Sequence, residues 1–260
     1  MRATTYIRIL KVLYYKHLLE SLSIEKTRKY TPFIILCHPR SGSTLLHTYL
    51  NSHPNILSLG EYLGNKVRNS NETKAAELVD KKLFKLYSRN IQAVGVKFFF
   101  QYTAYPLGKD MISLLASRQS VLVVYLYREN LLRNLVSLKI AENTGQYTMW
   151  KKGQKMKVEK RKIYLSAEEC KTQLMSMDEH SHYCRKLFKN HDLLPISYES
   201  LVSHPTTTLT RVQKFLKVKP YKLQSLLIRQ NPEPLTKLIL NYNEIKQALA
   251  STKWAKMLEG

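Results

Sequence analysis

The chain has 260 residues, 44% of them hydrophobic, which is enough to bury the core of one sizeable α/β domain without a second one. Its 42 Lys and Arg residues against 19 Asp and Glu give a formal net charge of +23. This charge indicates an anionic partner: a nucleotide, an acidic glycan, a nucleic acid or a membrane surface. The widely separated Cys37, Cys170 and Cys184 argue against a disulfide framework and a zinc site, and for a reducing compartment.

Residues 1–30 are basic and predict a helix. Apolar side chains recur there at helical spacing at Ile7, Leu10, Tyr14, Leu18 and Leu22. Arg8, Lys11 and Lys16 interrupt the apolar run well before the roughly 20 residues that a membrane span needs. No cleavable signal peptide is visible. We expect this helix to pack on the domain surface, with attachment to a membrane surface as the alternative.

The stretch from Phe33 onwards predicts an anion-binding strand–loop–helix unit. Phe33–Cys37 is a short apolar run typical of a buried strand, and Thr44–Leu50 has the apolar spacing of a helix. Between them, residues 38–43 form a tight polar loop. The unpaired N–H groups of the first helical turn would face an anion in this loop, and Arg40 adds forked donors that match a phosphate or sulfate.

The loop is not a standard nucleotide-binding P-loop, GxxxxGK followed by Ser or Thr. It has no first Gly and no Lys after Gly42, so the use of ATP or GTP through that motif is disfavoured. No clear metal-holding Asp follows a predicted strand, and the sequence requires no metal. A nucleotide-dependent kinase is therefore retained only as an alternative.

Two charged residues lie near this unit in the predicted topology. The chain turns back at His53-Pro54, which can bring Glu61 towards the cleft. Ile91–Phe100 predicts a strand, and Lys97 lies inside it. A buried Lys needs a partner, so Lys97 is either paired or reaches water at the strand end.

Val121–Tyr127 is the strongest strand signal in the chain. Its nearly continuous apolar run is typical of a central parallel strand that is covered on both faces. Arg128 follows directly, and Asn130 can cap a helix running to about Glu142. Ser137 lies on that helix, nine residues after Arg128.

The remaining segments alternate between helices and strands. Residues 143–165 begin with a polar and very basic stretch that we interpret as an insert over the site, where acceptor specificity could reside. Its aromatic and basic residues also fit single-stranded nucleic acid, although no nucleic-acid-binding signature accompanies them. The other predicted elements are helices at 66–89, 166–190, 208–216 and 231–258, and a strand at 193–201. Ser166 and Glu169 can form a capping box at the start of the helix at 166–190.

Three motifs resemble one family. PRSGSTLL, followed by a helix and HPNI, is similar to the 5′-phosphosulfate loop of sulfotransferases that use 3′-phosphoadenosine-5′-phosphosulfate (PAPS), above all the bacterial carbohydrate-type branch with the Nod-factor and trehalose sulfotransferases. RENLLRNLVS resembles the 3′-phosphate element of that family, and YESL resembles its YEDL element. The resemblance covers roughly residues 32–258. The Gly-rich GxxGxWK loop of the cytosolic steroid and phenol sulfotransferases is missing.

The resemblance implies a three-layer α/β sandwich with a central parallel sheet, formed by residues 1–260 as a single domain. The implied reaction moves the sulfuryl group of PAPS to a hydroxyl, or an amine, of a carbohydrate or small metabolite and releases 3′-phosphoadenosine-5′-phosphate (PAP). Arg40, Lys97 and Glu61 would be catalytic, with Glu61 as the general base and His47 and His53 as the alternatives for that role. The implied donor-binding residues are Arg40, Ser41, Gly42, Ser43, Thr44, Arg128, Ser137 and Tyr198, and Arg229 could supply some of the contacts that the missing Gly-rich loop makes elsewhere in the family.

The resemblance also bears on location and partners. Golgi members of the family carry a membrane anchor at their N-terminus, and none is visible here, so we expect a cytoplasmic enzyme. We expect a small-molecule or glycan acceptor, no nucleic acid and no transmembrane segment, and a homodimer is left open. A basic nucleic-acid-binding protein is the second alternative.

Overall fold

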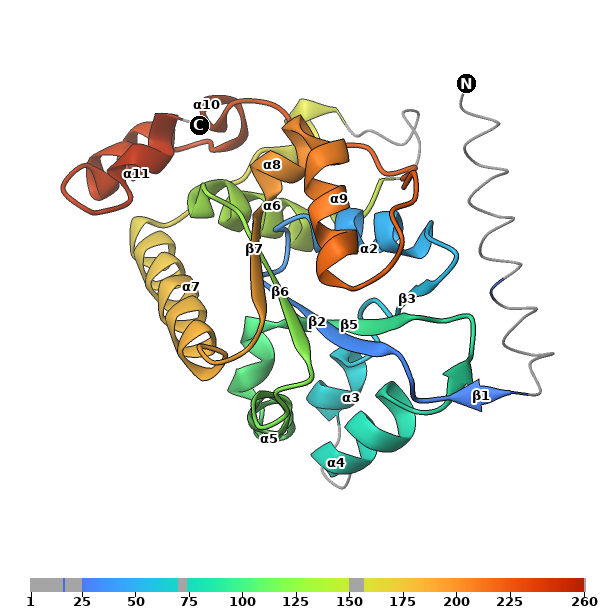
Figure 1. Cartoon of the computed structure of the whole chain (residues 1–260). Coiled ribbons are helices and arrows are strands. Elements are labelled where there is room, and N and C mark those ends of the chain that lie inside the picture. The colour runs from blue at the N-terminus through green and yellow to red at the C-terminus, as the bar shows by residue number, and fades with distance from the viewer. Residues whose placement is uncertain (1–15, 17–24, 70–73, 150–156, 260) are drawn as a thin grey trace.

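The computed structural model describes residues 16, 25–69, 74–149 and 157–259 (Figure 1). The predicted N-terminal helix therefore lies largely outside the described residues. The same holds for residues 150–156 of the predicted insert.

A five-stranded parallel sheet forms the centre of the molecule, in the order β3-β5-β2-β6-β7. Its strands are β2 (Thr31–Cys37), β3 (Ile56–Ser58), β5 (Ala93–Phe99), β6 (Leu122–Tyr127) and β7 (Leu193–Ser197). Cys37 at the end of β2 lies opposite Phe99 of β5 and Leu126 of β6. These three strands therefore end together, so the residues that follow them share one edge. The predicted parallel α/β sheet is confirmed.

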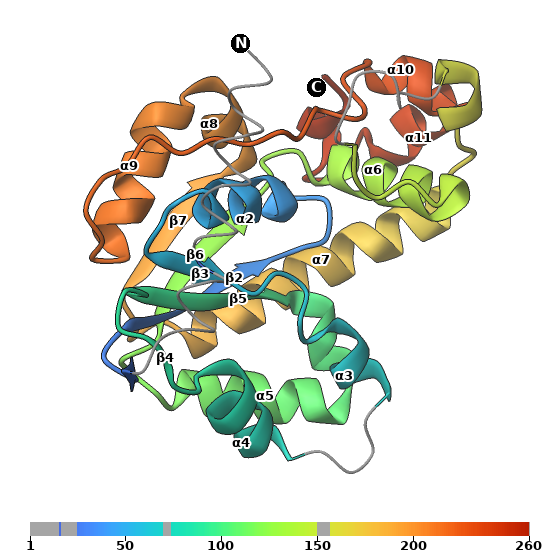
Figure 2. The same cartoon turned by 90° about the vertical axis from the view of Figure 1, so that its right-hand side faces the viewer.

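Helices cover both faces of this sheet. Figures 1 and 2 show α2 (Ser43–Asn51), α8 (Tyr198–Ser203) and α9 (Pro205–Phe215) on one side, and α4 (Ala75–Glu77) and α5 (Pro106–Ala116) on the other. This is the predicted three-layer arrangement. The other helices are α3 (Gly64–Asn69), α6 (Leu131–Thr144), α7 (Ala167–Leu187), α10 (Leu235–Leu238) and α11 (Tyr242–Leu249). Short π- and 3₁₀-helical turns at 78–83, 100–104, 158–161 and 255–259, and the small antiparallel pair β1 (Lys26–Thr27) and β4 (Tyr87–Ser88), complete the described fold.

Side-chain caps fix where the two long helices begin. The Asn130 side chain accepts a hydrogen bond from the Arg133 N–H at the start of α6, and Ser166 accepts one from the Glu169 N–H at the start of α7. Such caps satisfy amides that have no partner within the helix. Both caps are predicted from the sequence and confirmed.

The buried apolar residues form two clusters. The larger one surrounds the sheet and includes the whole of Phe33–Cys37. The second lies among α6, α7, α10 and α11, and its members include Leu135, Leu174, Leu238 and Trp254. Helix α6, which follows β6, therefore packs with its apolar side chains in this second cluster.

Three predicted elements are wrong in detail. Residues 66–89 do not form one solvated helix: they contain α3, α4, a π-helical turn and β4, and Leu78 and Leu83 are buried in the main cluster. Residues 231–258 are likewise split into α10, α11 and a final turn, because the chain is extended at Ile239 between the two helices. The predicted strand at 193–201 ends at Ser197, whose hydroxyl accepts a hydrogen bond from the Ser200 N–H and starts α8.

One glycine in the sheet allows a tight contact between strands. Gly95 of β5 lies opposite Phe33 of β2, and a Cβ atom added to it would lie 2.4 Å from the Phe33 ring. We expect Gly95→Ala to lower the free energy of unfolding by about 1–3 kcal/mol, the usual effect of overpacking a buried site. Urea unfolding measures this. Phe33→Leu in the same chain should recover part of the loss, and fully additive effects would contradict the steric explanation.

Candidate active site

The loop after β2 leaves the first turn of α2 open. Arg40 and Gly42 both have left-handed backbone conformations, with φ of 65° and 90°. The buried Ser41 donates from its hydroxyl to the His38 carbonyl at 2.7 Å, which holds the loop closed. No side chain caps α2 at Gly42. The N–H groups at this helix start are therefore available to an anion, as the sequence predicts.

A cavity of about 280 Å³ lies outside the carboxyl edge of the sheet, next to this loop. Most of the predicted donor-binding residues line it, namely Arg40, Gly42, Ser43, Thr44, Arg128, Ser137, Tyr198 and Arg229. Ser41 does not, since its hydroxyl and N–H both bond to the His38 carbonyl. Glu61 and Lys97 also lie outside the cavity lining. The structure thus brings together the residues of the two predicted phosphate elements.

Arg40 connects the two elements directly. Its Nε donates to the Ser137 hydroxyl at 3.1 Å, and its two terminal nitrogens donate to the Tyr147 carbonyl and the Gln230 side chain. Burial lowers the pKa of the guanidinium from its ordinary value, but the group remains a cation near neutral pH. A fixed positive charge therefore lies between the start of α2 and the middle of α6.

Arg128 is a buried cation with spare hydrogen-bonding capacity. Its side chain is 8% exposed and lies over the Tyr198 ring, 4.8 Å from the centroid. Among the residues that the structure describes, its Nε has no hydrogen-bond partner, and Oε1 of Glu199 lies 3.9 Å from it. Burial lowers the pKa of Arg128 to about 10. A buried donor without a partner costs stability, which an anion in the cavity would offset.

Tyr198 packs against the loop because Gly42 has no side chain. A Cβ atom at Gly42 would lie 2.6 Å from Cδ2 of Tyr198. The ring therefore lies between Gly42 and the Arg128 guanidinium and forms one wall of the cavity. Both this close approach and the positive φ require glycine at position 42.

Two chain segments far apart in sequence complete the cavity. Most of their cavity-lining residues are not predicted from the sequence. They are residues 147–149, which follow α6, and residues 227–231, which precede α10. The Ile228 N–H donates to the Met149 carbonyl at 3.0 Å, and the Gln230 side chain donates to the Gln146 carbonyl at 3.2 Å. The second segment is irregular, so no periodicity marks it, although Asn231-Pro232 is a typical turn dipeptide.

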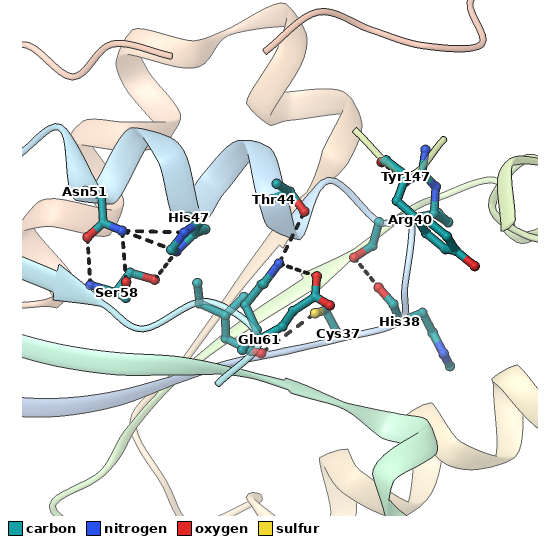
Figure 3. A network of polar contacts seen from close by, with 12 residues as sticks. Cys37, His38, Arg40, Thr44, His47, Asn51, Ser58, Glu61 and Tyr147 are labelled. Atoms are coloured by element: carbon teal, nitrogen blue, oxygen red, sulfur yellow. Dashed lines mark hydrogen bonds and ion pairs between the residues drawn. The ribbon is translucent and has the colours of Figure 1, made fainter. Parts of the chain in front are cut away.

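Lys97, Glu61 and Thr44 form a polar group beside the start of α2, where Figure 3 labels Glu61 and Thr44. Lys97 is 2% exposed, and its Nζ donates to Glu61 Oε1 at 2.8 Å and to Thr44 Oγ1 at 3.2 Å. The Glu61 side chain is 55% exposed. The turn at Gly60, with φ 61°, brings Glu61 there, and the Lys97 N–H donates to the Gly60 carbonyl at 2.9 Å. Of the two predicted options for Lys97, the structure shows pairing.

The two nearby histidines are held in other interactions. His47 Nδ1 lies 2.8 Å from the Ser58 hydroxyl, and burial, together with the Lys97 charge, lowers its pKa to about 4. His53 is 1% exposed and has both ring nitrogens bonded to backbone groups, of Lys219 and Asn55. Both histidines are thus engaged in other contacts, whereas the Glu61 carboxylate is exposed and can be reached by an acceptor from solvent.

The fold and the cavity define an α/β protein with an arginine-lined cavity where parallel strands end. Comparison with known proteins agrees with this class. A model of the sulfotransferase family matches residues 32–108. Nodulation protein H of Rhizobium tropici is 30% identical over 241 residues, which cover 88% of this chain and 93% of the relative. Nodulation protein H of Rhizobium meliloti strain 1021 is 26% identical, with 88% and 95% covered.

The chain belongs to the sulfotransferase family, and it is an enzyme that transfers a sulfuryl group from a sulfonate donor. Among solved structures, the sulfotransferase domain from the curacin biosynthetic pathway is similar over 89% of this chain and 84% of that domain, with a TM-score of 0.41 and 18% identity. In the described part of the chain, no helix is both long and apolar enough to span a membrane.

Proposed function

We propose that the chain transfers the sulfuryl group of PAPS to a hydroxyl, or less readily an amine, of a carbohydrate or small-metabolite acceptor, with PAP as the second product. The observation that carries this proposal is the cavity between the open start of α2 and Arg128, whose buried Nε has no hydrogen-bond partner in the described part of the chain. Three arginines line the cavity, namely Arg40, Arg128 and Arg229. This donor set fits a ligand with two separate phosphate groups.

We assign the residues of the cavity to two subsites. Arg128 and Ser137 would hold the 3′-phosphate of the donor, and Tyr198 would lie near its adenine. Arg40 and the N–H groups at the start of α2 would hold the 5′-phosphosulfate. When bound, PAPS supplies an activated sulfuryl group on a phosphate leaving group. Arg229, which is exposed at the edge of the cavity, would add positive charge there.

Glu61 and Lys97 would act at the acceptor side. A hydroxyl becomes a good nucleophile only as its proton is removed, and Glu61 offers an accessible carboxylate for that proton. Lys97 holds Glu61 in place and also reaches Thr44 in the first turn of α2. It would stabilise negative charge that develops on the leaving group. The carbohydrate acceptor is supported by the resemblance of the motifs to the carbohydrate-type branch of the family.

Removing Arg128 should weaken the binding of ligands that carry a 3′-phosphate. Arg128→Ala is expected to reduce PAP affinity by about 1.5–3 kcal/mol, the usual contribution of a hydrogen bond to a charged group. It should have a much smaller effect on adenosine-5′-phosphosulfate, which has no 3′-phosphate. Titration calorimetry with both ligands measures the difference.

The same titration tests the proposed donor. ATP and a short oligonucleotide serve as competitors that represent the kinase and nucleic-acid alternatives. If the unmodified protein binds ATP or the oligonucleotide more tightly than PAP, the proposed donor is wrong. If Arg128→Ala weakens PAP and adenosine-5′-phosphosulfate equally, Arg128 does not contact the 3′-phosphate.

A further inference from the structure

Arg161 forms a buried ion pair just behind the cavity. Its side chain is 3% exposed, and its two terminal nitrogens donate to the two carboxylate oxygens of Glu233 at 2.7 and 2.8 Å. Glu233 is 14% exposed. This two-bond geometry is the most specific that an arginine and a carboxylate can form. Neither residue lines the cavity.

The same arginine also holds two cavity residues that precede Glu233 in the chain, Gln230 and Asn231. Its Nη1 donates to the Gln230 carbonyl and to Oδ1 of the Asn231 side chain, both at 3.1 Å. The carboxamide of Asn231 is thereby oriented, because its oxygen faces Arg161 and its nitrogen faces the opposite way. That nitrogen donates to the Ser137 hydroxyl at 3.4 Å. A chain of contacts therefore leads from Arg161 through Asn231 to Ser137.

Gln230 extends the same arrangement to the loop after β2. While Arg161 holds its carbonyl, its side-chain oxygen accepts a hydrogen bond from Arg40. The segment 228–233 has no helix or strand of its own and so lacks a regular backbone ladder. It is held by Arg161 and by the Met149 carbonyl, and Arg133 also donates to the Glu233 carbonyl at 3.0 Å. The loss of Arg161 would remove the bonds that fix the Gln230 carbonyl and the side-chain oxygen of Asn231.

We propose that Arg161, together with Glu233, is a positioning residue for the donor site, acting through Asn231 on the Ser137 subsite. This inference rests on the proposed function, because it assumes that Ser137 contacts the 3′-phosphate of the donor. Burying an ion pair brings little or no net stability, since desolvation offsets the attraction between the charges. Its value here lies in the geometry that it gives to residues 230 and 231.

The test replaces the whole pair, Arg161→Met together with Glu233→Leu. Apolar residues of similar volume at such a pair are often neutral or stabilising, so this variant should keep its melting temperature. Its affinity for PAP should nevertheless fall about tenfold, as expected when a hydrogen bond to a charged group is lost. Its affinity for adenosine 5′-phosphate, which has no 3′-phosphate, should fall much less. General loosening of the structure would weaken both ligands equally.

A second pair in the chain provides a matched control. Arg118 donates to both carboxylate oxygens of Asp80, at 2.6 and 2.9 Å, and neither residue lines the cavity. Arg118→Met with Asp80→Leu should leave the PAP affinity unchanged. If the Arg161/Glu233 variant is folded and binds PAP as tightly as the unmodified protein, the inference is wrong. If the unmodified protein itself does not bind PAP, the proposed function fails instead.

A double-mutant cycle covers the case in which the pair variant does not fold. Arg161→Lys keeps the charge but cannot make the same set of bonds, and Asn231→Ala removes the intermediate residue. If Arg161 acts through Asn231, the two substitutions should weaken PAP binding less together than the sum of their separate effects. Additive effects on PAP affinity would overturn the proposed route through Asn231.

Discussion

Replacing Glu61 with Gln is expected to reduce turnover about 10²–10⁴-fold, the usual range for the loss of a general base. Gln has the same size and can still accept the hydrogen bond from Lys97, but it cannot take the acceptor's proton. Glu61 lies outside the donor cavity, so PAP affinity should stay unchanged. Single-turnover kinetics with labelled PAPS and an extract of the host as the source of acceptor measures the rate.

Two further variants make this result specific. Glu25, which pairs with Arg89 at 3.0 Å on the exposed surface, gives a matched control, and Glu25→Gln should be as active as the unmodified protein. His47→Gln tests the rival base. If Glu61→Gln retains most of its turnover while His47→Gln is inactive, the base is His47, despite the burial that lowers its pKa to about 4.

Arg40→Ala should reduce turnover by roughly 10²–10³-fold, equivalent to about 3–4 kcal/mol of transition-state stabilisation. The guanidinium lies in the cavity between α2 and Ser137, where it can neutralise charge on the leaving group. Its loss should have a smaller effect on stability, because the residue lies in a loop. Turnover and thermal unfolding of the same preparation separate the two effects.

Arg40→Lys serves as the comparison for this variant. Lysine keeps the charge but cannot bond simultaneously to Ser137, Tyr147 and Gln230 as Arg40 does. Turnover between those of Ala and Arg would show that both charge and geometry contribute. An Arg40→Ala variant that remains folded and almost fully active would mean that the loop after β2 is not the sulfuryl site.

The sequence was sufficient to predict the elements whose pattern is local. The short apolar runs at Phe33–Cys37 and Val121–Tyr127 form strands of a sheet that is covered on both faces, as such runs predict. The caps at Asn130 and Ser166 depend on residues only three positions apart. The predicted site residues Arg40, Arg128 and Ser137 come together because the strands before them are neighbours.

The remainder of the site depends on contacts across the whole chain. Gln230 and Asn231 lie in an irregular segment, and they reach Arg40 and Ser137 across more than 90 residues of sequence. No periodic pattern marks such a segment before the fold is known. The sequence left open whether Lys97 is paired or reaches water, because its partner Glu61 belongs to a different strand–turn unit. The prediction of one solvated helix at 66–89 was wrong because the burial of Leu78 and Leu83 depends on packing against other parts of the fold, which the local sequence does not show.

The order of the strands has a consequence for how such enzymes can diversify. Lys97 lies on β5, Arg40 follows β2 and Arg128 follows β6. Each of these three cations therefore belongs to one of three adjacent strands or to the residues directly after it. Neighbouring strands lie about 4.8 Å apart, and this spacing does not change with the side chains. The side of the sheet with β3 and β5 carries Glu61 and Lys97, whereas the side with β6 and β7 carries Arg128 and Tyr198. Under the proposed assignment, substitutions around β3 would change acceptor recognition and leave the half of the sheet with Arg128 and Tyr198 intact, so new acceptors could be acquired one loop at a time.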